Sequence, residues 1–327
     1  MNKPISFCIM ILSILLAMPL LAGCASRTDT SPISKTGIYF HTVITVTIYD
    51  SRKEDLLDEC MTMADSYDKL LSPTIKGSDM WNINHSQGTP VTVSNDTIDL
   101  LNIALYYAKL SDGAVDPTIG SLSTLWNFGT ENEGIIPNAS EITDALSHVD
   151  YTMVQIDGNT VTLSDPDASL NLGFIAKGFI ADQIKAFLVK NGVTSGIIDL
   201  GHNILTIGKK PDQTPYRIGI QKPFADTGVN AETVSVINQS VVSSGTYEQY
   251  FEKDGILYHH ILSTVTGYPV ENELDSVTIL SDKSVDGDAL STLCFILGIE
   301  KGSALIERIP DTEAVFITKE GKLISTS

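Results

Sequence analysis

Apolar residues follow two different periods along this chain, one typical of strands and the other of helices. From Tyr39 to Asp50 they alternate with polar residues, which predicts a strand. From Leu56 to Leu70 they recur every three or four residues, which predicts an amphipathic helix, and Asn95–Ala108 and Asp286–Leu297 repeat this period. Further strands are expected at 154–156, 161–163, 196–200, 216–221, 233–238, 256–262 and 276–280, with a closing hairpin over 312–327.

The order of these elements predicts the fold class. Strands and helices are mixed without the regular alternation that a parallel sheet with crossover helices requires. Asp157-Gly158 stands between two short strands and is a strong hairpin signal. No repeat and no shift in composition divides the chain. We therefore expect an α+β fold, a single domain of mixed sheets with packed helices.

The stretch Ser169–Asp182 combines both periods. Its first residues alternate as far as Leu172, as in a strand, and its second half has helical spacing, with Gly173 and Gly178 on either side of the change. A strand that turns through glycine into a helix presents unpaired N–H groups, which favour a phosphate, and Lys177 is placed to reach such an anion. A buried turn with a snorkelling lysine explains the pattern equally well.

Composition and charge limit the classes of function. The chain has 327 residues, 43% of them apolar and 19% charged, which is typical of a globular protein with a large core. The 21 basic and 40 acidic residues give a formal charge of −19. Because contacts to nucleic-acid phosphates need clustered Lys and Arg, we expect no nucleic-acid partner.

The beginning of the chain has the features of an export signal. Lys3 precedes an apolar run, Ile5–Leu21, and the small residues Ala22 and Gly23 precede Cys24. Leu-Ala-Gly-Cys resembles the bacterial lipobox, in which the cysteine is diacylated and becomes the mature N-terminus. We therefore expect a signal peptide over 1–23 and a lipidated tether over 24–37. The protein would be anchored by lipid at the extracytoplasmic face of the cell membrane. The alternative is an uncleaved anchor helix with an incidental cysteine.

Two side chains of the helix expected at 286–297 suit a metal ion. Asp288 and Thr292 are four residues apart, so a carboxylate and a hydroxyl lie on one helical face, as a hard cation such as Mg²⁺ prefers. The structural alternative is an acidic first turn with a threonine bonded back to a carbonyl. The mature cysteines Cys60 and Cys294 both lie in apolar helical patterns, so we expect buried thiols.

His260 is the candidate base. A neutral imidazole near pH 7 can take a proton from a hydroxyl without a large pKa shift. Its neighbour His259 alternates to the opposite face of the expected strand, so only one of the two can face a site. Either histidine, taken alone, is more often structural.

Eight short motifs occur in the order that is found in ApbE-type flavin transferases, and between about Phe40 and Gly298 the chain resembles this family. They are Leu-Leu-Ser-Pro, Gly-Ala-Val-Asp-Pro-Thr-Ile-Gly, Leu-Trp-Asn-Phe-Gly, Leu-Gly-Phe-Ile-Ala-Lys-Gly, Leu-Gly-His-Asn, Ser-Ser-Gly-Thr-Tyr, His-Ile-(x)₄-Thr-Gly-Tyr-Pro and Asp-Ala-Leu-Ser-Thr. The family consists of FAD:protein FMN transferases. The resemblance implies a domain related to the T-fold over 38–327.

The resemblance also implies an activity and a site. FAD is the substrate, Mg²⁺ the cofactor, and FMN passes through a phosphoester bond to a Ser or Thr of an acceptor flavoprotein, such as a redox-pump subunit, while AMP leaves. His260 matches the proposed base. The backbone carbonyl of Phe174 matches a metal ligand beside Asp288 and Thr292. The residues that match FAD contacts are Phe40, Thr74, Ala114, Val115, Asp116, Asn171, Lys177 and Ile261.

Three positions depart from the family pattern. Phe174 follows Gly173 where a second glycine is usual, and His202 replaces the second glycine of Leu-Gly-Gly-Asn. Ser263 stands where an aspartate usually follows the histidine motif. Two other functions therefore stay open: a FAD pyrophosphatase that releases free FMN and AMP, and a FAD-binding lipoprotein without turnover.

Overall fold

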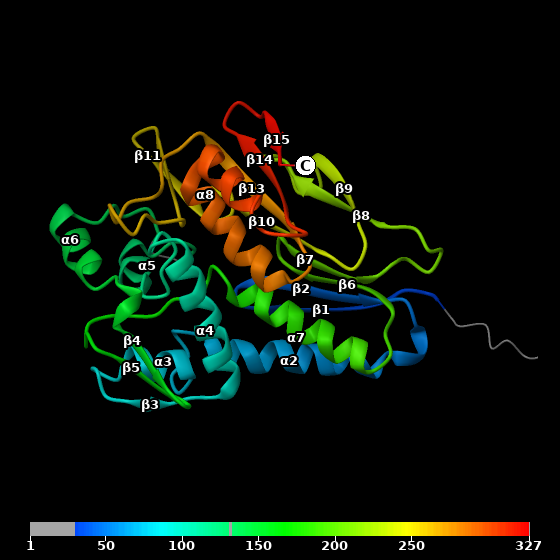
Figure 1. Ribbon diagram of the computed structural model, residues 1–327, viewed down its shortest axis with the longest axis horizontal. Coiled ribbons are helices and arrows are strands. Elements are labelled where there is room, and N and C mark those ends of the chain that lie inside the picture. The colour runs from blue at the N-terminus through cyan, green and yellow to red at the C-terminus, as the bar shows by residue number, and fades with distance from the viewer. Residues whose placement is uncertain (1–29, 131–132, 327) are drawn as a thin grey trace, which may run out of the picture.

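The computed structural model of the protein describes residues 30–130 and 133–326. Its centre is an eight-stranded sheet in which all neighbouring strands are antiparallel (Figure 1). In spatial order the strands are β1 (Ile33–Tyr39), β2 (Thr42–Ile48), β6 (Ser195–Leu200), β7 (Asn203–Gly208), β10 (Ser240–Gly245), β13 (Leu274–Ser281), β14 (Glu313–Thr318) and β15 (Leu323–Ser325). The α+β prediction is confirmed.

The two faces of this sheet are both covered, by different elements. Ile279 and Phe316 face the main core with α2 (Asp55–Leu71), α7 (Ala176–Lys190) and α8 (Ser284–Ile306), whereas the next residues, Leu280 and Ile317, face a second core. A hairpin of β8 (Tyr216–Gln221) and β9 (Asn230–Val236) closes the second core. Because both faces are covered, β13 and β14 are buried along nearly their whole length instead of at every second residue.

A smaller lobe lies beside the ends of α7 and α8 (Figure 1). It contains α3 (Asp79–Asn84), α4 (Asn95–Leu110), α5 (Gly120–Trp126), α6 (Ala139–Ser147), the sheet of β3 (Val91–Thr92), β5 (Thr160–Leu163) and β4 (Val154–Asp157), and the hairpin of β11 (Tyr250–Lys253) and β12 (Ile256–His259). Trp126 packs in a third core there, and its indole N–H donates to the Gly267 carbonyl at 2.7 Å. This hydrogen bond joins the Leu-Trp-Asn-Phe-Gly motif to the Thr-Gly-Tyr-Pro motif, which lies far from it in the sequence.

The four helices that the sequence predicted by periodicity are present as α2, α4, α7 and α8. Gly298 interrupts α8 with φ 75° and ψ 178°, one residue after the expected end at Leu297. Within the described ranges α8 is the one helix long and apolar enough to cross a membrane, but it packs against α7 and the central sheet. Cys60 and Cys294 are buried in the main core, and burial raises the pKa of each thiol to about 12.

The structure corrects the expectation for the first strand. Phe40 and His41 have positive φ and form the turn between β1 and β2, so β2 begins only at Thr42. Residues 33–37, which we expected in the tether, belong to β1 and pair with β2. The folded domain thus begins at about residue 33. The signal peptide 1–23, Cys24 and the first part of the tether lie outside the described residues.

Residues 169–172 do not form a strand of any sheet. Ser169 makes only an isolated bridge to Ile119, and the amide of Asn171 donates to the carbonyl of Pro117 at 2.8 Å. The backbone of this segment thus forms its hydrogen bonds with loop residues. Its apolar residues alternate because Leu170 and Leu172 are buried in the main core. The following helix, α7, begins at Ala176, and β12 ends at His259 rather than at residue 262.

Candidate active site

A cavity of about 550 Å³ opens where the small lobe meets the ends of β10, α7 and α8. This volume is within the range of pockets that bind small molecules and cofactors. Every candidate residue of the folded domain lines it: Phe40, Thr74, Ala114, Val115, Asp116, Asn171, Phe174, Lys177, His260, Ile261, Asp288 and Thr292. The tertiary structure therefore gathers into one cavity the residues that the family resemblance selected along more than 250 positions of sequence.

The close contact of α7 with α8 positions Asp288. The amide of Gly178 in the first turn of α7 donates to Asp288 Oδ2 at 2.8 Å, and Asp288 is 4% exposed. A Cβ atom at Gly178 would lie 2.3 Å from the carbonyl oxygen of Ser284, so the two helices can approach this closely only because residue 178 is a glycine. A second set of hydrogen bonds runs from α8 to α7: the carboxylate of Asp182 in α7 accepts from the amides of Ser284 (3.0 Å) and Val285 (2.9 Å) at the start of α8.

This arrangement modifies the expectation of a phosphate site at the start of α7. The Gly178 N–H is not available to a ligand because the Asp288 carboxylate already caps it. Lys177 lines the cavity, and its Nζ lies 3.4 Å from the carbonyl of Gly201. Burial raises the pKa of Asp288, while the charge of Lys177 and the Gly178 amide act in the opposite direction. Lys177 thus remains the anion-binding candidate, without the Gly178 amide.

His260 and His259 have different surroundings. His260 lines the cavity, and its Nδ1 lies 3.4 Å from the carbonyl of Gln249; if Nδ1 bears the proton, Nε2 is the basic nitrogen. Burial lowers the pKa of His260, which favours the neutral imidazole. His259 is buried away from the cavity, between the Val270 carbonyl (3.0 Å from Nε2) and the Ile261 amide (3.3 Å from Nδ1).

Asp116 fixes the loop that contains Ala114 and Val115. One carboxylate oxygen accepts from the amide (2.8 Å) and the hydroxyl (2.6 Å) of Thr118, and the other accepts from the amide of Tyr151 (2.8 Å). Burial raises the pKa of this carboxyl. The resemblance implied a FAD contact at Asp116. The structure shows its carboxylate already engaged with the protein, so it shapes the wall of the cavity.

Two further candidates stand in turns at the cavity wall. The Thr74 hydroxyl lies 3.1 Å from the Ser72 hydroxyl, and the side-chain oxygen of Asn171 accepts from the Gly173 amide at 2.8 Å. Both contacts are local, so they hold the turns in shape before any ligand arrives. The backbone near Phe174 is therefore fixed independently of a ligand.

Comparison with known proteins identifies the family. The model of the ApbE family matches residues 40–316. The chain belongs to the ApbE family. A protein of Klebsiella pneumoniae named FAD:protein FMN transferase is 39% identical over 280 residues, which are 85% of this chain and 86% of that protein. One of the same name from Treponema pallidum is 34% identical, covering 90% and 87%. The crystal structure of the Thermotoga maritima ApbE protein superposes with a TM-score of 0.83 at 27% identity, covering 90% of this chain and 96% of that one.

The departures from the ApbE pattern have clear structural consequences. Ser263 does not line the cavity; its hydroxyl accepts from the amides of Val265 and Thr266, both at 3.2 Å, and caps a turn. His202 does line the cavity, in the left-handed backbone conformation (φ 59°) that a glycine adopts more easily, and its ring meets that of Tyr247 edge to face at 5.9 Å. His202 thus places an imidazole in the cavity wall, whereas Ser263 lies outside the cavity.

The cavity residues fit a hard divalent cation. Asp288 supplies a carboxylate and Thr292 a hydroxyl, which lies 3.1 Å from the Ser244 hydroxyl at the end of β10. Glu248, which the sequence reasoning did not select, lines the same cavity and has a buried oxygen, Oε1, without a hydrogen-bond partner. Its position directly after the Ser-Ser-Gly-Thr-Tyr motif was the available signal.

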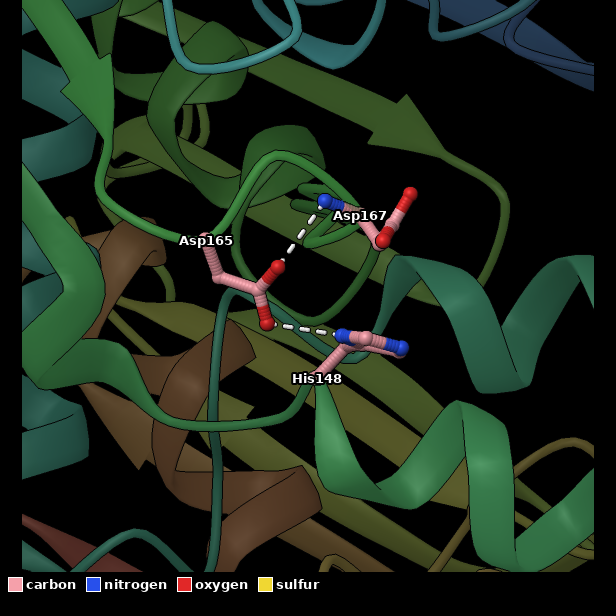
Figure 2. A group of neighbouring side chains, drawn as sticks. All are labelled: His148, Asp165 and Asp167. Atoms are coloured by element: carbon pink, nitrogen blue, oxygen red, sulfur yellow. Dashed lines mark hydrogen bonds and ion pairs between the residues drawn. The ribbon is translucent and has the colours of Figure 1, made fainter.

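A second group of potential metal ligands lies outside the cavity. Figure 2 shows His148 directed at Asp165, with Asp167 beside them. His148 Nδ1 lies 2.7 Å from Asp165 Oδ2, and the Asp167 amide donates to Asp165 Oδ1 at 2.9 Å. The hydrogen bond with Asp165 raises the pKa of His148 and lowers that of Asp165. These contacts describe an ion pair that ties the end of α6 to the turn after β5, and we assign no metal to it.

Proposed function

We propose that this protein is a FAD:protein FMN transferase, which attaches FMN through a phosphoester bond to a Ser or Thr of an acceptor protein and releases AMP. The names of the Klebsiella and Treponema relatives support this activity. The observation that carries the proposal is that a basic imidazole (His260), a cation (Lys177) and a carboxylate (Asp288) line one cavity. A pyrophosphate and an incoming hydroxyl require these three kinds of group.

His260 takes the proton from the acceptor hydroxyl. Because burial keeps the imidazole neutral, Nε2 can accept this proton near pH 7. The hydroxyl oxygen forms a bond to the phosphorus of the FMN half of FAD, and the bond from that phosphorus to the bridging oxygen breaks. AMP leaves with the electron pair. Water at the position of the acceptor would give free FMN and AMP instead, so the pyrophosphatase alternative uses the same site.

Two groups of residues prepare the substrate for this step. The Lys177 ammonium lies at the start of α7 and binds a phosphate oxygen, reducing the charge that the nucleophile meets. Ala114 and Val115, in the loop fixed by Asp116, together with Phe40, Thr74 and Ile261, form the walls against which FAD lies. Asn171 stands beside Gly173 at the turn into α7 and contacts the nucleotide.

Asp288, Thr292 and the Phe174 carbonyl would hold a Mg²⁺ ion. Carboxylate, hydroxyl and carbonyl oxygens are the ligands that this cation prefers. When bound, the cation offsets negative charge on the pyrophosphate and on the departing AMP. The Gly178 amide holds the Asp288 carboxylate in place before the cation arrives.

A single incubation distinguishes the candidate functions. Purified protein is mixed with FAD, Mg²⁺ and a redox-pump subunit as acceptor, and the products are separated by denaturing gel fluorescence and chromatography. A fluorescent acceptor supports the transferase. Free FMN with an unlabelled acceptor would indicate a pyrophosphatase, and unchanged FAD would indicate a binding protein without turnover.

We also propose that the protein acts at the extracytoplasmic face of the cell membrane, attached through lipid on Cys24. The lipobox-like Leu-Ala-Gly-Cys after the apolar run supports this location. Cys24→Ser should release the protein from the membrane or leave it unprocessed. Normal processing and membrane attachment of this variant would contradict the anchor.

A further inference from the structure

Glu248 has an unusual buried oxygen. Its Oε1 is closed to solvent and has no hydrogen-bond partner, although the residue lines the cavity. A buried polar atom without a partner is energetically unfavourable, and a charged one is more so. Such an atom indicates a ligand that completes its interactions.

The position of Glu248 places it on the side of the cavity where Asp288 and Thr292 lie. β10 ends at Gly245, and the Ser244 hydroxyl contacts both Ser291 (2.8 Å) and Thr292 (3.1 Å) on α8. The backbone then turns within a few residues, with the Glu248 amide directed at the Gly245 carbonyl (3.4 Å). The contact of β10 with α8 therefore brings the turn that carries Glu248 to the part of the cavity lined by Thr292 and Asp288.

The charges around Glu248 leave a negative excess. Its carboxylate raises the pKa of Asp288, so the two acidic groups repel each other across the cavity. Lys177 is the nearby counter-charge, and its ammonium is directed at the Gly201 carbonyl. Two carboxylates that share one cavity favour a divalent cation between them, because it balances both charges.

The alternative role for Glu248, orienting the base, has less support. His260 Nδ1 already faces the Gln249 carbonyl, and Oε1 of Glu248 has no partner on His260. The negative charge of Glu248 does raise the pKa of His260, but burial has the larger, opposite effect. This electrostatic effect on His260 acts without a hydrogen bond, so it does not explain why Oε1 of Glu248 is buried without a partner.

We propose that Glu248 is a ligand of the divalent cation, so that this site has two carboxylates, Glu248 and Asp288, rather than one. This inference deepens the proposed function, because it adds a residue to the cation site of the same cavity. It assigns Glu248, which directly follows the Ser-Ser-Gly-Thr-Tyr motif, to cation binding.

The test measures cation binding without turnover. Mn²⁺ replaces Mg²⁺, and electron paramagnetic resonance counts free Mn²⁺ in a titration of the full mature domain, first alone and then with ADP as an unreactive diphosphate. Glu248→Gln keeps the size of the side chain and removes its charge, and it should weaken Mn²⁺ binding at least about tenfold. Asp288→Asn should weaken it as well.

Glu252→Gln is the matched control, because it makes the same change at an exposed residue of β11 outside the cavity. It should bind Mn²⁺ like the wild type. Thermal melting verifies that each variant folds, and Glu248→Asp, which shortens the side chain by one methylene, should give an intermediate affinity.

Two results would overturn the inference: Mn²⁺ affinity of Glu248→Gln equal to that of Glu252→Gln, or no Mn²⁺ binding by the wild type with or without ADP. Failure of the proposed function is distinguishable from both. A wild type that binds Mn²⁺ through Glu248 but never labels an acceptor would refute the transferase activity alone.

Discussion

The Gly178 amide donates to the Asp288 carboxylate at 2.8 Å, and this bond joins the start of α7 to the first half of α8. Asp182 of α7 returns the interaction by capping the first amides of α8. Each helix thus uses a carboxylate of the other as its N-terminal cap. The candidate cation ligand is therefore also a structural element, and its position depends on how closely the two helices approach.

Gly178→Ala should separate the two helices. The added Cβ would meet the Ser284 carbonyl at 2.3 Å, and this neighbour is backbone, which cannot rotate away. We expect a loss of about 1–3 kcal/mol in the free energy of unfolding and weaker Mn²⁺ binding, because Asp288 moves with α8. Urea unfolding and Mn²⁺ titration measure the two effects. Gly158→Ala, in an open hairpin turn, would lower stability through its positive φ but leave Mn²⁺ affinity intact.

His260→Ala should slow FMN transfer by about a hundredfold to ten-thousandfold, the usual contribution of a positioned base. FAD affinity should be retained, because the cavity walls remain. His85→Ala is the control: this histidine stacks on Trp81 outside the cavity. Initial flavinylation rates at saturating FAD and Mg²⁺ decide the question, and a wild-type rate for His260→Ala would refute its assignment as the base.

His259 should make the folded state sensitive to acid. Burial lowers its pKa from 6.5 to about 4. Below about pH 6.5 the unfolded chain binds a proton at this residue, whereas the folded protein does not until about pH 4. Stability should therefore fall as the pH decreases through this window, by up to about 3 kcal/mol.

His259→Gln isolates this effect, since glutamine can donate to the Val270 carbonyl but does not titrate. The difference in unfolding free energy between wild type and variant should shrink from pH 7 to pH 5. If the unfolding free energies of wild type and variant changed in parallel with pH, the lowered pKa of His259 would be contradicted. His259→Ala removes two buried hydrogen bonds and should therefore lower the stability of the folded protein.

Ser263→Asp should leave the rate of FMN transfer nearly unchanged. The serine hydroxyl caps the turn at Val265 and Thr266 and lies outside the cavity, and an aspartate would accept the same two amides. Ser263→Ala removes the cap and should lower stability by about 1 kcal/mol. Rates and melting temperatures of both variants test this, and a large gain in rate for Ser263→Asp would mean that its carboxylate reaches the base.

Asp116→Asn should loosen the FAD-binding loop. One carboxylate oxygen accepts from Thr118 and the other from Tyr151, and the substitution replaces one of these oxygens with an NH₂ group that cannot accept. A buried amide N–H, of either Thr118 or Tyr151, therefore loses its partner. We expect a loss of about 1–3 kcal/mol in stability and weaker FAD binding. Asp157→Asn, on the exposed hairpin of β4 and β5, is the control. FAD titration by fluorescence would show equal affinities if Asp116 had no part in shaping the loop.

The sequence by itself determined the local elements and the set of candidate residues. Helical periodicity located α2, α4, α7 and α8, although α8 is buried around most of its circumference rather than along one stripe. The eight ordered motifs named the residues that line the cavity. Periodicity was wrong at residues 169–172, where alternation reflects burial on one side of an extended loop rather than pairing in a sheet.

Tertiary structure alone decided what these residues do for one another. Asp288 caps α7 only because Gly178 lets two helices, more than a hundred residues apart, approach closely. Nothing in the sequence shows that the side-chain oxygens of Asp116 and Ser263 accept from nearby amides. The position of Glu248 depends on the contact of β10 with α8, and non-local packing of this kind leaves no period in the sequence.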